Sequence, residues 1–221
     1  MLRVGLTGDL GSGKSTVARM FAERGAVVLS SDEMGRAMMQ PGEAVYVSIV
    51  ERFGQGVLTS DRSLDRRELA RLVFSDGRAE ELNAIVHPAV IAEQARQIAE
   101  IARTRPDAIV VVESALIFTT KHAPAGEPWS KRFDRVVLVT APEAQKISRY
   151  VERVAGGREL SAEERLSLEA DARRRLALQA MNEEHAAECL VIRNEDGFEA
   201  LERQVEIVWS QLEQLPRQQT R

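Results

Sequence analysis

The sequence is poor in cysteine, in aromatic side chains and in long uncharged apolar runs. Its single cysteine, Cys189, excludes an intrachain disulfide and a zinc site built from cysteine thiolates, which favours a reducing compartment. No uncharged apolar run approaches the ~18 residues that a membrane span needs, and none has the form of a secretory signal. The 34 acidic residues outnumber the 30 basic ones, so no overall positive field attracts nucleic acid. We expect a cytoplasmic protein that binds neither membranes nor nucleic acid.

What the chain does contain is a set of short apolar runs. With 221 residues, of which 44% are hydrophobic, it is long enough for one compact domain with insertions. The runs are rich in β-branched residues and nearly continuous, as in strands that are buried on both faces. Segments with helical patterning separate them, which predicts an α/β fold with a mostly parallel sheet flanked by helices. The predicted strands lie at residues 2–7, 26–30, 108–112, 135–140 and 189–192.

The stretch GDLGSGKST, residues 8–16, follows the first predicted strand and precedes a helix predicted for residues 14–24. It matches the motif G-x-x-x-x-G-K-[ST], whose glycines let backbone N–H groups surround phosphate oxygens. The positive N-terminal end of the helix adds to this attraction. In this motif Lys14 reaches the outer phosphates and the Ser15 hydroxyl binds Mg²⁺. The residues predicted to bind the nucleotide are Gly8, Gly11, Ser12, Gly13, Lys14, Ser15 and Thr16.

Two acidic residues follow predicted strands. Asp32 ends the stretch VVLSSD, and Glu113 comes directly after IVVV. Because parallel strands end at the same edge of a sheet, we expect both near the phosphate loop. A carboxylate there can accept a hydroxyl proton or hold a metal ion during phosphate transfer. The residues alone leave other interpretations open, since Asp32 could cap the following helix and Glu113 could be an exposed loop carboxylate.

Between the second and third predicted strands the pattern is helical throughout. Residues 35–107 are far more than one crossover connection requires, so we interpret them as an inserted helical region. The remaining strands and the phosphate loop then form a core. This nucleotide-binding core is predicted to comprise residues 1–34, 108–147 and 186–221.

A second polar helical segment, residues 148–185, is rich in arginine. Its Gly156-Gly157 pair is typical of a hinge, and Ser161-x-x-Glu164 has the form of a capping box. Arginines on such a segment can close over a transferring phosphate and exclude water, although runs of charge on helices are also usual on solvated faces. We predict that this segment is a lid.

Taken in order along the chain, these motifs resemble those of dephospho-CoA kinases, which phosphorylate the 3′-hydroxyl of the ribose in dephospho-coenzyme A. The resemblance covers nearly the whole chain, and continues after the loop with QPGEAVYVSIVERFG, LDRRELARLVFSD and LNAIVHPAVI. It ends with AAECLVIRNEDGFEALERQV near the C-terminus. It implies a P-loop NTPase fold of the nucleoside-monophosphate-kinase type, use of ATP and Mg²⁺, and dephospho-CoA as the acceptor that the inserted helical region binds.

The resemblance also implies roles for single residues. Asp32 becomes the general base for the acceptor hydroxyl, and Arg149 matches an arginine early in the family's lid helix. With Lys14, these are the predicted catalytic residues. Glu113, together with Ser15, is the predicted Mg²⁺ site.

Three further residues match positions that the family uses for its acceptor substrate. His87, with Pro88, matches a His-Pro pair, and the sequence places it at the start of a helix. Arg175 and Gln179 match the arginine and glutamine of an RxxxQ stretch. We therefore predict that His87, Arg175 and Gln179 contact the substrate.

The sequence departs from the family pattern at several places. Asp9 stands where the family often has glycine, and the usual run Asp-x-Pro-Leu-Leu-Phe-Glu reads here as ESALIFT, from Glu113 to Thr119. Alternatives therefore stay open: a kinase for another small acceptor, a nucleotide-dependent switch, or a scaffold without turnover. The sequence contains no N-K-x-D-type stretch that could recognise guanine, which argues against a GTP-dependent switch. Nothing in the sequence points to a particular oligomeric state.

Overall fold

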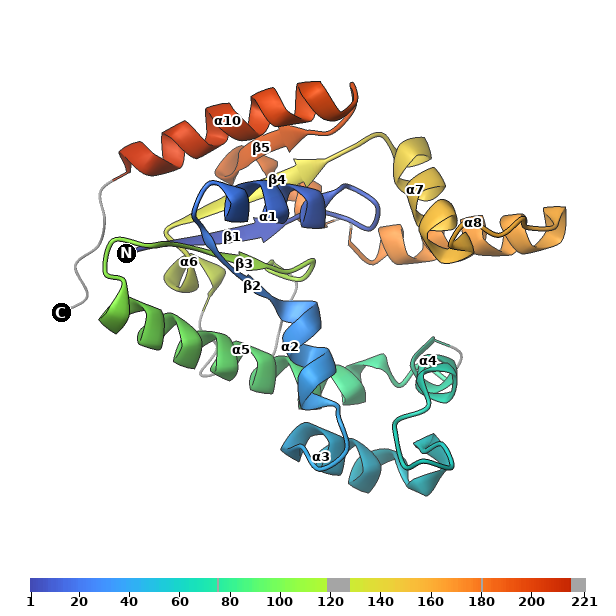
Figure 1. The fold of residues 1–221 in the computed structure, drawn as a ribbon. Helices are drawn as coiled ribbons and strands as arrows, with labels where there is room; N and C mark the ends of the chain where they lie inside the picture. Colours follow the sequence, from blue (N-terminus) through green and yellow to red (C-terminus); the bar gives the residue numbers. More distant parts are fainter. Residues whose placement is uncertain (75, 119–127, 180, 216–221) are drawn as a thin grey trace. The chain divides into compact units, whose positions relative to one another are not determined.

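The computed structural model describes residues 1–74, 76–118, 128–179 and 181–215 (Figure 1). Within them, five strands form one sheet in the order β2-β3-β1-β4-β5. β1 pairs in parallel with β3 and with β4, and β4 pairs in parallel with β5. Each strand begins at the predicted residue or one residue later, so the predicted α/β class is confirmed. The strands are β1 (Leu2–Thr7), β2 (Val27–Ser30), β3 (Ile109–Glu113), β4 (Arg135–Thr140) and β5 (Leu190–Arg193).

The chain divides into two compact units. The first consists of the described parts of Met1–Leu29, Ile101–Thr119 and Trp129–Arg221. The second consists of those of Ser30–Glu100 and Thr120–Pro128. The phosphate loop and the arginine-rich segment therefore belong to the same unit, and their contacts can be followed directly.

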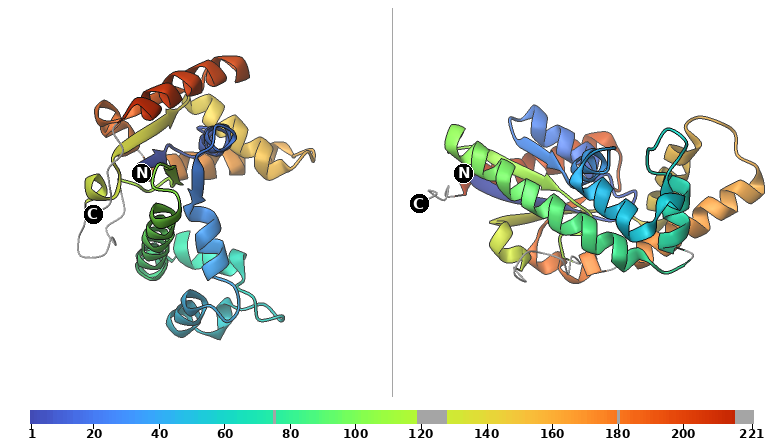
Figure 2. Two further views of the ribbon diagram at one scale, coloured as in Figure 1. Left: turned by 60° about the vertical axis from the view of Figure 1, so that its left-hand side comes forward. Right: turned by 90° about the horizontal axis from the view of Figure 1, so that it is seen from below.

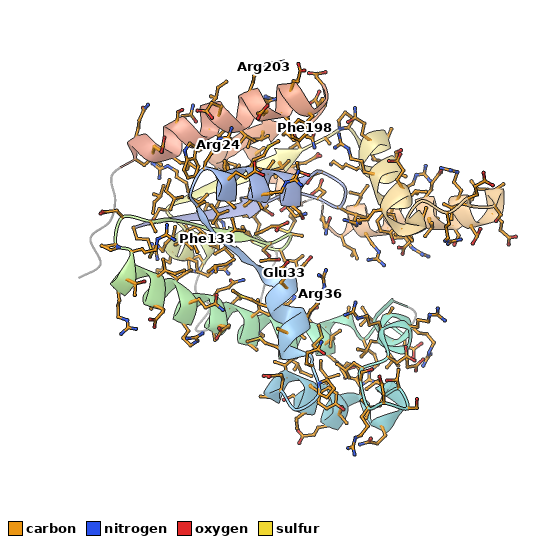
Figure 3. All side chains as sticks on the ribbon, viewed as in Figure 1. Arg24, Glu33, Arg36, Phe133, Phe198 and Arg203 are labelled. Carbon is orange, nitrogen blue, oxygen red and sulfur yellow. The ribbon has the colours of Figure 1, made fainter. Side chains whose placement is uncertain are left out.

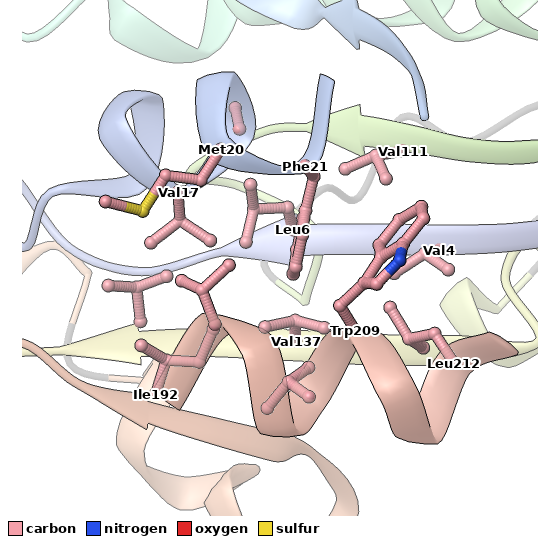
Figure 4. Close-up of a cluster of buried hydrophobic side chains, with 14 of the residues drawn as sticks. Val4, Leu6, Val17, Met20, Phe21, Val111, Val137, Ile192, Trp209 and Leu212 are labelled. Atoms are coloured by element: carbon pink, nitrogen blue, oxygen red, sulfur yellow. The ribbon is translucent and has the colours of Figure 1, made fainter. Parts of the chain in front are cut away.

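The main core of the first unit lies between the sheet and two helices, α1 (Lys14–Glu23) and α10 (Phe198–Gln214). Val17 and Phe21 of α1 are fully buried, because their i, i+4 spacing places both on the face toward the sheet. Phe21 also meets Trp209 of α10, with ring centroids 5.8 Å apart. Figure 4 shows the side chains of both helices converging with those of the strands, and Figure 2 gives two further views of these layers.

The arginine-rich segment forms α7 (Glu143–Ala155) and α8 (Ala162–Ala177). Gly156, in the left-handed conformation with φ 59°, ends α7. The predicted capping box is confirmed at the start of α8. The Glu164 N–H donates to Ser161 Oγ at 3.1 Å, and the Ser161 N–H donates to Glu164 Oε2 at 2.8 Å. The two helices share a small apolar cluster of Ile147, Tyr150, Val151 and Ala172.

The second unit is helical, as predicted for this part of the chain. Its small core contains Val45 and Ile49 from α3 (Ala44–Phe53) and Leu69 and Leu72 from α4 (Arg66–Phe74). No helix of the described chain is both long and apolar enough to span a membrane. The remaining helices of the described chain are α2 (Ser31–Met38), η1 (Gln55–Val57), α5 (Ala79–Thr104), α6 (Trp129–Arg132), α9 (Met181–Glu184) and η3 (Ala186–Glu188).

The prediction that His87 and Pro88 begin a helix is wrong. Both lie inside α5, which begins at Ala79 and continues to Thr104. Proline lacks a backbone N–H, so it leaves the carbonyl four residues earlier, that of Ala84, without its helical hydrogen bond. Ala84 is exposed, and solvent can therefore satisfy that carbonyl. The helix thus passes through the position at which proline suggested a boundary.

Candidate active site

The glycine loop connects the carboxyl end of β1 to the first residue of α1. This is the strand-loop-helix context that the motif requires for phosphate binding. β1 is the central strand of the sheet, and its buried apolar side chains hold the start of the loop in place. The loop and the first turn of α1 contain all the predicted nucleotide-binding residues: Gly8, Gly11, Ser12, Gly13, Lys14, Ser15 and Thr16.

Two of the glycines are required by space as well as by backbone conformation. Gly11 has φ 73°, and a Cβ there would lie 2.2 Å from the carbonyl oxygen of Lys146. Gly13 has φ 98°, and a Cβ there would lie 2.3 Å from Nδ2 of Asn194. The backbone of the loop is therefore packed so closely that a side chain at either position would displace it. What remains is a cradle lined by backbone groups.

The polar groups of this cradle fit an anionic ligand such as a polyphosphate. Lys14 reaches back across the loop, and its Nζ donates to the carbonyl of Asp9 at 3.3 Å. The Ser12 hydroxyl is fully buried, and it has no hydrogen-bond partner among the described residues. α1 adds the partial positive charge of its first turn. An ammonium group, a hydroxyl and a helix N-terminus thus meet at one loop.

Ser15 and Glu113 are brought together by the sheet. Glu113 ends β3, the neighbour of β1, and its Oε1 accepts a 2.7 Å hydrogen bond from Ser15 Oγ. A hydroxyl, a carboxylate and phosphate oxygens are a donor set that Mg²⁺ prefers. The described chain contains no cluster of three histidine, cysteine or acidic side chains that could hold a metal ion without help. Ser15 and Glu113 are the side chains that would hold a metal ion at this position.

Arg149 lies on α7 and contacts the loop rather than extending freely into solvent. Its Nη1 donates to the Gly11 carbonyl at 3.4 Å, and its Nη2 donates to the Asn194 carbonyl at 3.1 Å. Asn194 follows β5, and its Nδ2 donates to the Ser12 carbonyl at 2.9 Å. One arginine thus connects the phosphate loop with the segment that follows the edge strand β5.

Gln179 also contacts the loop. It follows α8, and its Oε1 accepts a 2.7 Å hydrogen bond from the Leu10 N–H. Arg175, four residues earlier, has its Nε 2.8 Å from Asp171 Oδ2, and its guanidinium carbon lies 5.6 Å from the centre of the Tyr150 ring. The two residues of the RxxxQ stretch therefore have different surroundings. Gln179 lies at the loop, and Arg175 lies between α7 and α8.

Arg175 lies beside a hydrogen-bonded pair of titratable side chains, Tyr150 and Asp171. Tyr150 donates to Asp171 at 2.5 Å, and burial, followed by this hydrogen bond, raises the pKa of the Tyr150 hydroxyl. Burial acts to raise the pKa of Asp171 too. The hydrogen bond from Tyr150 and the charge of Arg175 nevertheless hold the pKa of that carboxyl below its ordinary value. Asp171 is thus held as a carboxylate that orients Arg175.

Comparison with known proteins identifies the family of this chain. A family model described as dephospho-CoA kinase matches residues 2–199. The chain belongs to the dephospho-CoA kinase family. A relative from Streptomyces avermitilis with that name is 37% identical over 96% of this chain and 94% of its own. A second relative with that name, from Moorella thermoacetica, is 37% identical over 96% of this chain and 93% of its own.

Solved structures agree with this family in fold. A crystal structure of a Thermus thermophilus protein is 30% identical, with a TM-score of 0.67 over 96% of this chain and 97% of that one. The solved structure of a dephospho-CoA kinase from Campylobacter jejuni is 20% identical. Its TM-score is 0.58, over 95% of this chain and 96% of that one. At 20% identity the second likeness shows the fold alone, and it agrees with the predicted parallel sheet flanked by helices.

Two residues that the family resemblance singles out lie in the second unit. Asp32 is exposed in the first turn of α2, beside the exposed Glu33 that Figure 3 labels. The interpretation of Asp32 as the cap of this helix is wrong, because Ser30 caps it by accepting a 3.3 Å hydrogen bond from the Glu33 N–H. The Asp32 carboxylate is therefore left for another role. His87 is half-buried within α5.

Sequence reasoning missed several polar residues at the loop. Lys146, Asn182 and Asn194 are all buried and all contact it. The one signal in the sequence was Asp9, which is unusual in this loop. A carboxylate that becomes buried there needs polar partners, and Lys146 and Asn182 supply them. Thr119, the end of the altered family run, lies outside the described residues.

Proposed function

We propose that this chain transfers the γ-phosphate of ATP to the 3′-hydroxyl of the ribose of dephospho-CoA, giving CoA and ADP. The observation that carries the proposal is the phosphate cradle between β1 and α1, with Lys14 crossing it and the Ser15–Glu113 pair beside it, in a chain of this family. We further propose that the enzyme works in the cytoplasm, in line with its single cysteine.

In this proposal the loop binds the triphosphate through Gly8, Gly11, Ser12, Gly13, Lys14, Ser15 and Thr16. Lys14 contacts the outer phosphates as a point charge. Ser15 and Glu113 would hold Mg²⁺, which would supply positive charge where negative charge develops during the transfer. Arg149, already at the loop, screens the charge of the transferring group. The support for each role is the geometry of the first unit together with the motif.

For the acceptor we propose that Asp32 accepts the proton of the attacking hydroxyl. Its carboxylate is exposed and does not cap α2, so it is available as a base. We propose that residues 35–107 bind the acceptor, with His87 among the contacts, and that residues 148–185 close over the site. Arg175 is proposed to contact the acceptor from that side. Gln179, which accepts a hydrogen bond from the Leu10 N–H, is proposed to serve the phosphate loop.

The test is ADP release from the full chain with ATP and Mg²⁺, with and without dephospho-CoA, followed by the mass of the product. The expected result is release that depends on dephospho-CoA, and a product heavier by one phosphate group. A Lys14→Ala preparation, purified identically, controls for contaminating kinases.

Parallel reactions with shikimate, gluconate and nucleoside monophosphates separate the rival kinases. Faster turnover of any of these would replace the proposed acceptor. ATP binding without turnover of any acceptor would favour a nucleotide-binding scaffold.

A further inference from the structure

A buried ion pair joins the phosphate loop to α7. Lys146 Nζ lies 2.6 Å from Asp9 Oδ2, and the two residues are 5% and 7% exposed. Asp9 lies within the glycine loop, so its carboxylate places a negative charge at the site that we propose for phosphate. Two charges withdrawn from water in this way need close partners, or each is strongly destabilising.

The second oxygen of Asp9 is also occupied. Asn182 of α9 donates from Nδ2 to Asp9 Oδ1 at 2.8 Å, and Asn182 Oδ1 accepts from Thr7 Oγ1 at 3.3 Å. Asn182 and Thr7 are fully buried. Both carboxylate oxygens of Asp9 are thus directed at α7 and α9, and the network continues to the last residue of β1.

Asp9 is close to the groups that would bind phosphate. Its own carbonyl accepts the hydrogen bond from Lys14 Nζ, and the Ser12 N–H donates to that carbonyl at 3.1 Å. Two residues along, Gly11 is packed against the Lys146 backbone. A carboxylate at this place repels a triphosphate unless a cation neutralises it.

We propose that Lys146 is a positioning residue for ATP: it neutralises the Asp9 carboxylate and, with Asn182, holds it turned away from the bound phosphates. The inference rests on the proposed function only in that the loop binds ATP. Without Lys146, the site keeps a buried, uncompensated negative charge beside the phosphates. Without the charge of Asp9, the site has lost the group that repels them.

This proposal predicts an asymmetry that a merely structural ion pair would not show. Lys146→Met should weaken ATP binding at least about tenfold, because the negative charge of Asp9 is left unpaired. Asp9→Asn should lower the melting temperature while leaving the ATP dissociation constant within about threefold of the wild-type value. The double variant Asp9→Asn with Lys146→Met should bind ATP nearly as well as the wild type, because both charges are gone.

The measurement is a direct titration of ATP·Mg²⁺ into each full-length variant, with the melting temperature recorded in parallel. Asp134→Asn is the matched control, since Asp134 forms a partly buried 2.8 Å ion pair with Arg3 at the other end of β1. It should lower the melting temperature and leave ATP affinity unchanged. Lys146→Gln, which keeps a hydrogen-bond donor, replaces Lys146→Met if the latter does not fold.

Two results would overturn the proposal. One is an ATP dissociation constant for the Lys146 variant within twofold of the wild-type value. The other is a double variant that binds ATP no better than the Lys146 single variant. Because the titration contains no acceptor, a failure to phosphorylate dephospho-CoA would count against the proposed function and leave this result intact.

Discussion

The Leu10 N–H of the phosphate loop donates a 2.7 Å hydrogen bond to Gln179 Oε1, across 169 residues of chain. From the family resemblance, Gln179 was predicted to contact the acceptor substrate. The structure places its side chain on the loop proposed to hold ATP. We therefore expect Gln179 to affect the binding of ATP.

Replacing Gln179 tests which substrate it serves. Gln179→Ala leaves the Leu10 N–H without its acceptor, and a neutral hydrogen bond contributes a net ~0.5–1.5 kcal/mol. The KM for ATP should rise roughly 2- to 12-fold, with the KM for dephospho-CoA little changed. Steady-state kinetics with each substrate varied in turn measures both.

Gln204 provides the matched control for this substitution. Its side chain bonds both the N–H and the carbonyl of Arg193 in β5. Gln204→Ala should lower stability without changing either KM. A rise confined to the KM for dephospho-CoA in Gln179→Ala would instead support the acceptor role.

Asp32→Asn tests the proposed general base. The amide cannot accept the proton of the attacking hydroxyl, so kcat should fall by roughly 10²-fold or more. The dissociation constant for ATP, measured without acceptor, should stay close to that of the wild type. Glu33→Gln, one residue along the same exposed helical turn, should keep nearly full activity. Near-normal turnover of Asp32→Asn would rule out this role.

The Ser15–Glu113 pair can be tested through its dependence on metal. Glu113→Gln removes a carboxylate that we expect to help hold Mg²⁺, so half-maximal activity should need at least about tenfold more Mg²⁺. The same titration with Glu188→Gln, an exposed carboxylate far along the chain, serves as the control. An unchanged Mg²⁺ requirement in Glu113→Gln would show that this carboxylate does not serve the metal.

Cys189 should be unreactive in the folded protein. Burial, and then the negative charge of Glu188, raises the pKa of its thiol from 9.0 to about 11. At pH 8 the thiolate fraction is then about 100-fold smaller than for an unperturbed thiol, and only the thiolate attacks. Ellman's reagent should label the native protein at least that much more slowly than the protein unfolded in guanidinium.

The rate of this labelling should also rise about tenfold for each pH unit between 7 and 10, since the thiolate is still a minor species throughout that range. A native rate that levels off near pH 9 would contradict the raised pKa.

Much of the fold could be predicted because it depends on local patterns. Continuous β-branched runs marked the strands, the glycine spacing marked the phosphate loop, and the Ser161-x-x-Glu164 pair marked the start of α8. His87 and Pro88 show the limit of local reasoning. Proline suggested a boundary, yet α5 continues through it, because the packing of a long helix outweighs one missing hydrogen bond.

Patterns along the chain were enough to predict where the strands lie and where the glycine loop connects a strand to a helix, since each arises from neighbouring residues. Which polar groups meet at that loop depends on how the chain folds in three dimensions. Lys146 reaches Asp9 across 137 residues, and Gln179 reaches Leu10 across 169. Such pairs have no period or spacing that a sequence displays. They form because the parallel sheet brings the ends of distant strands, and the helices that follow them, to one edge.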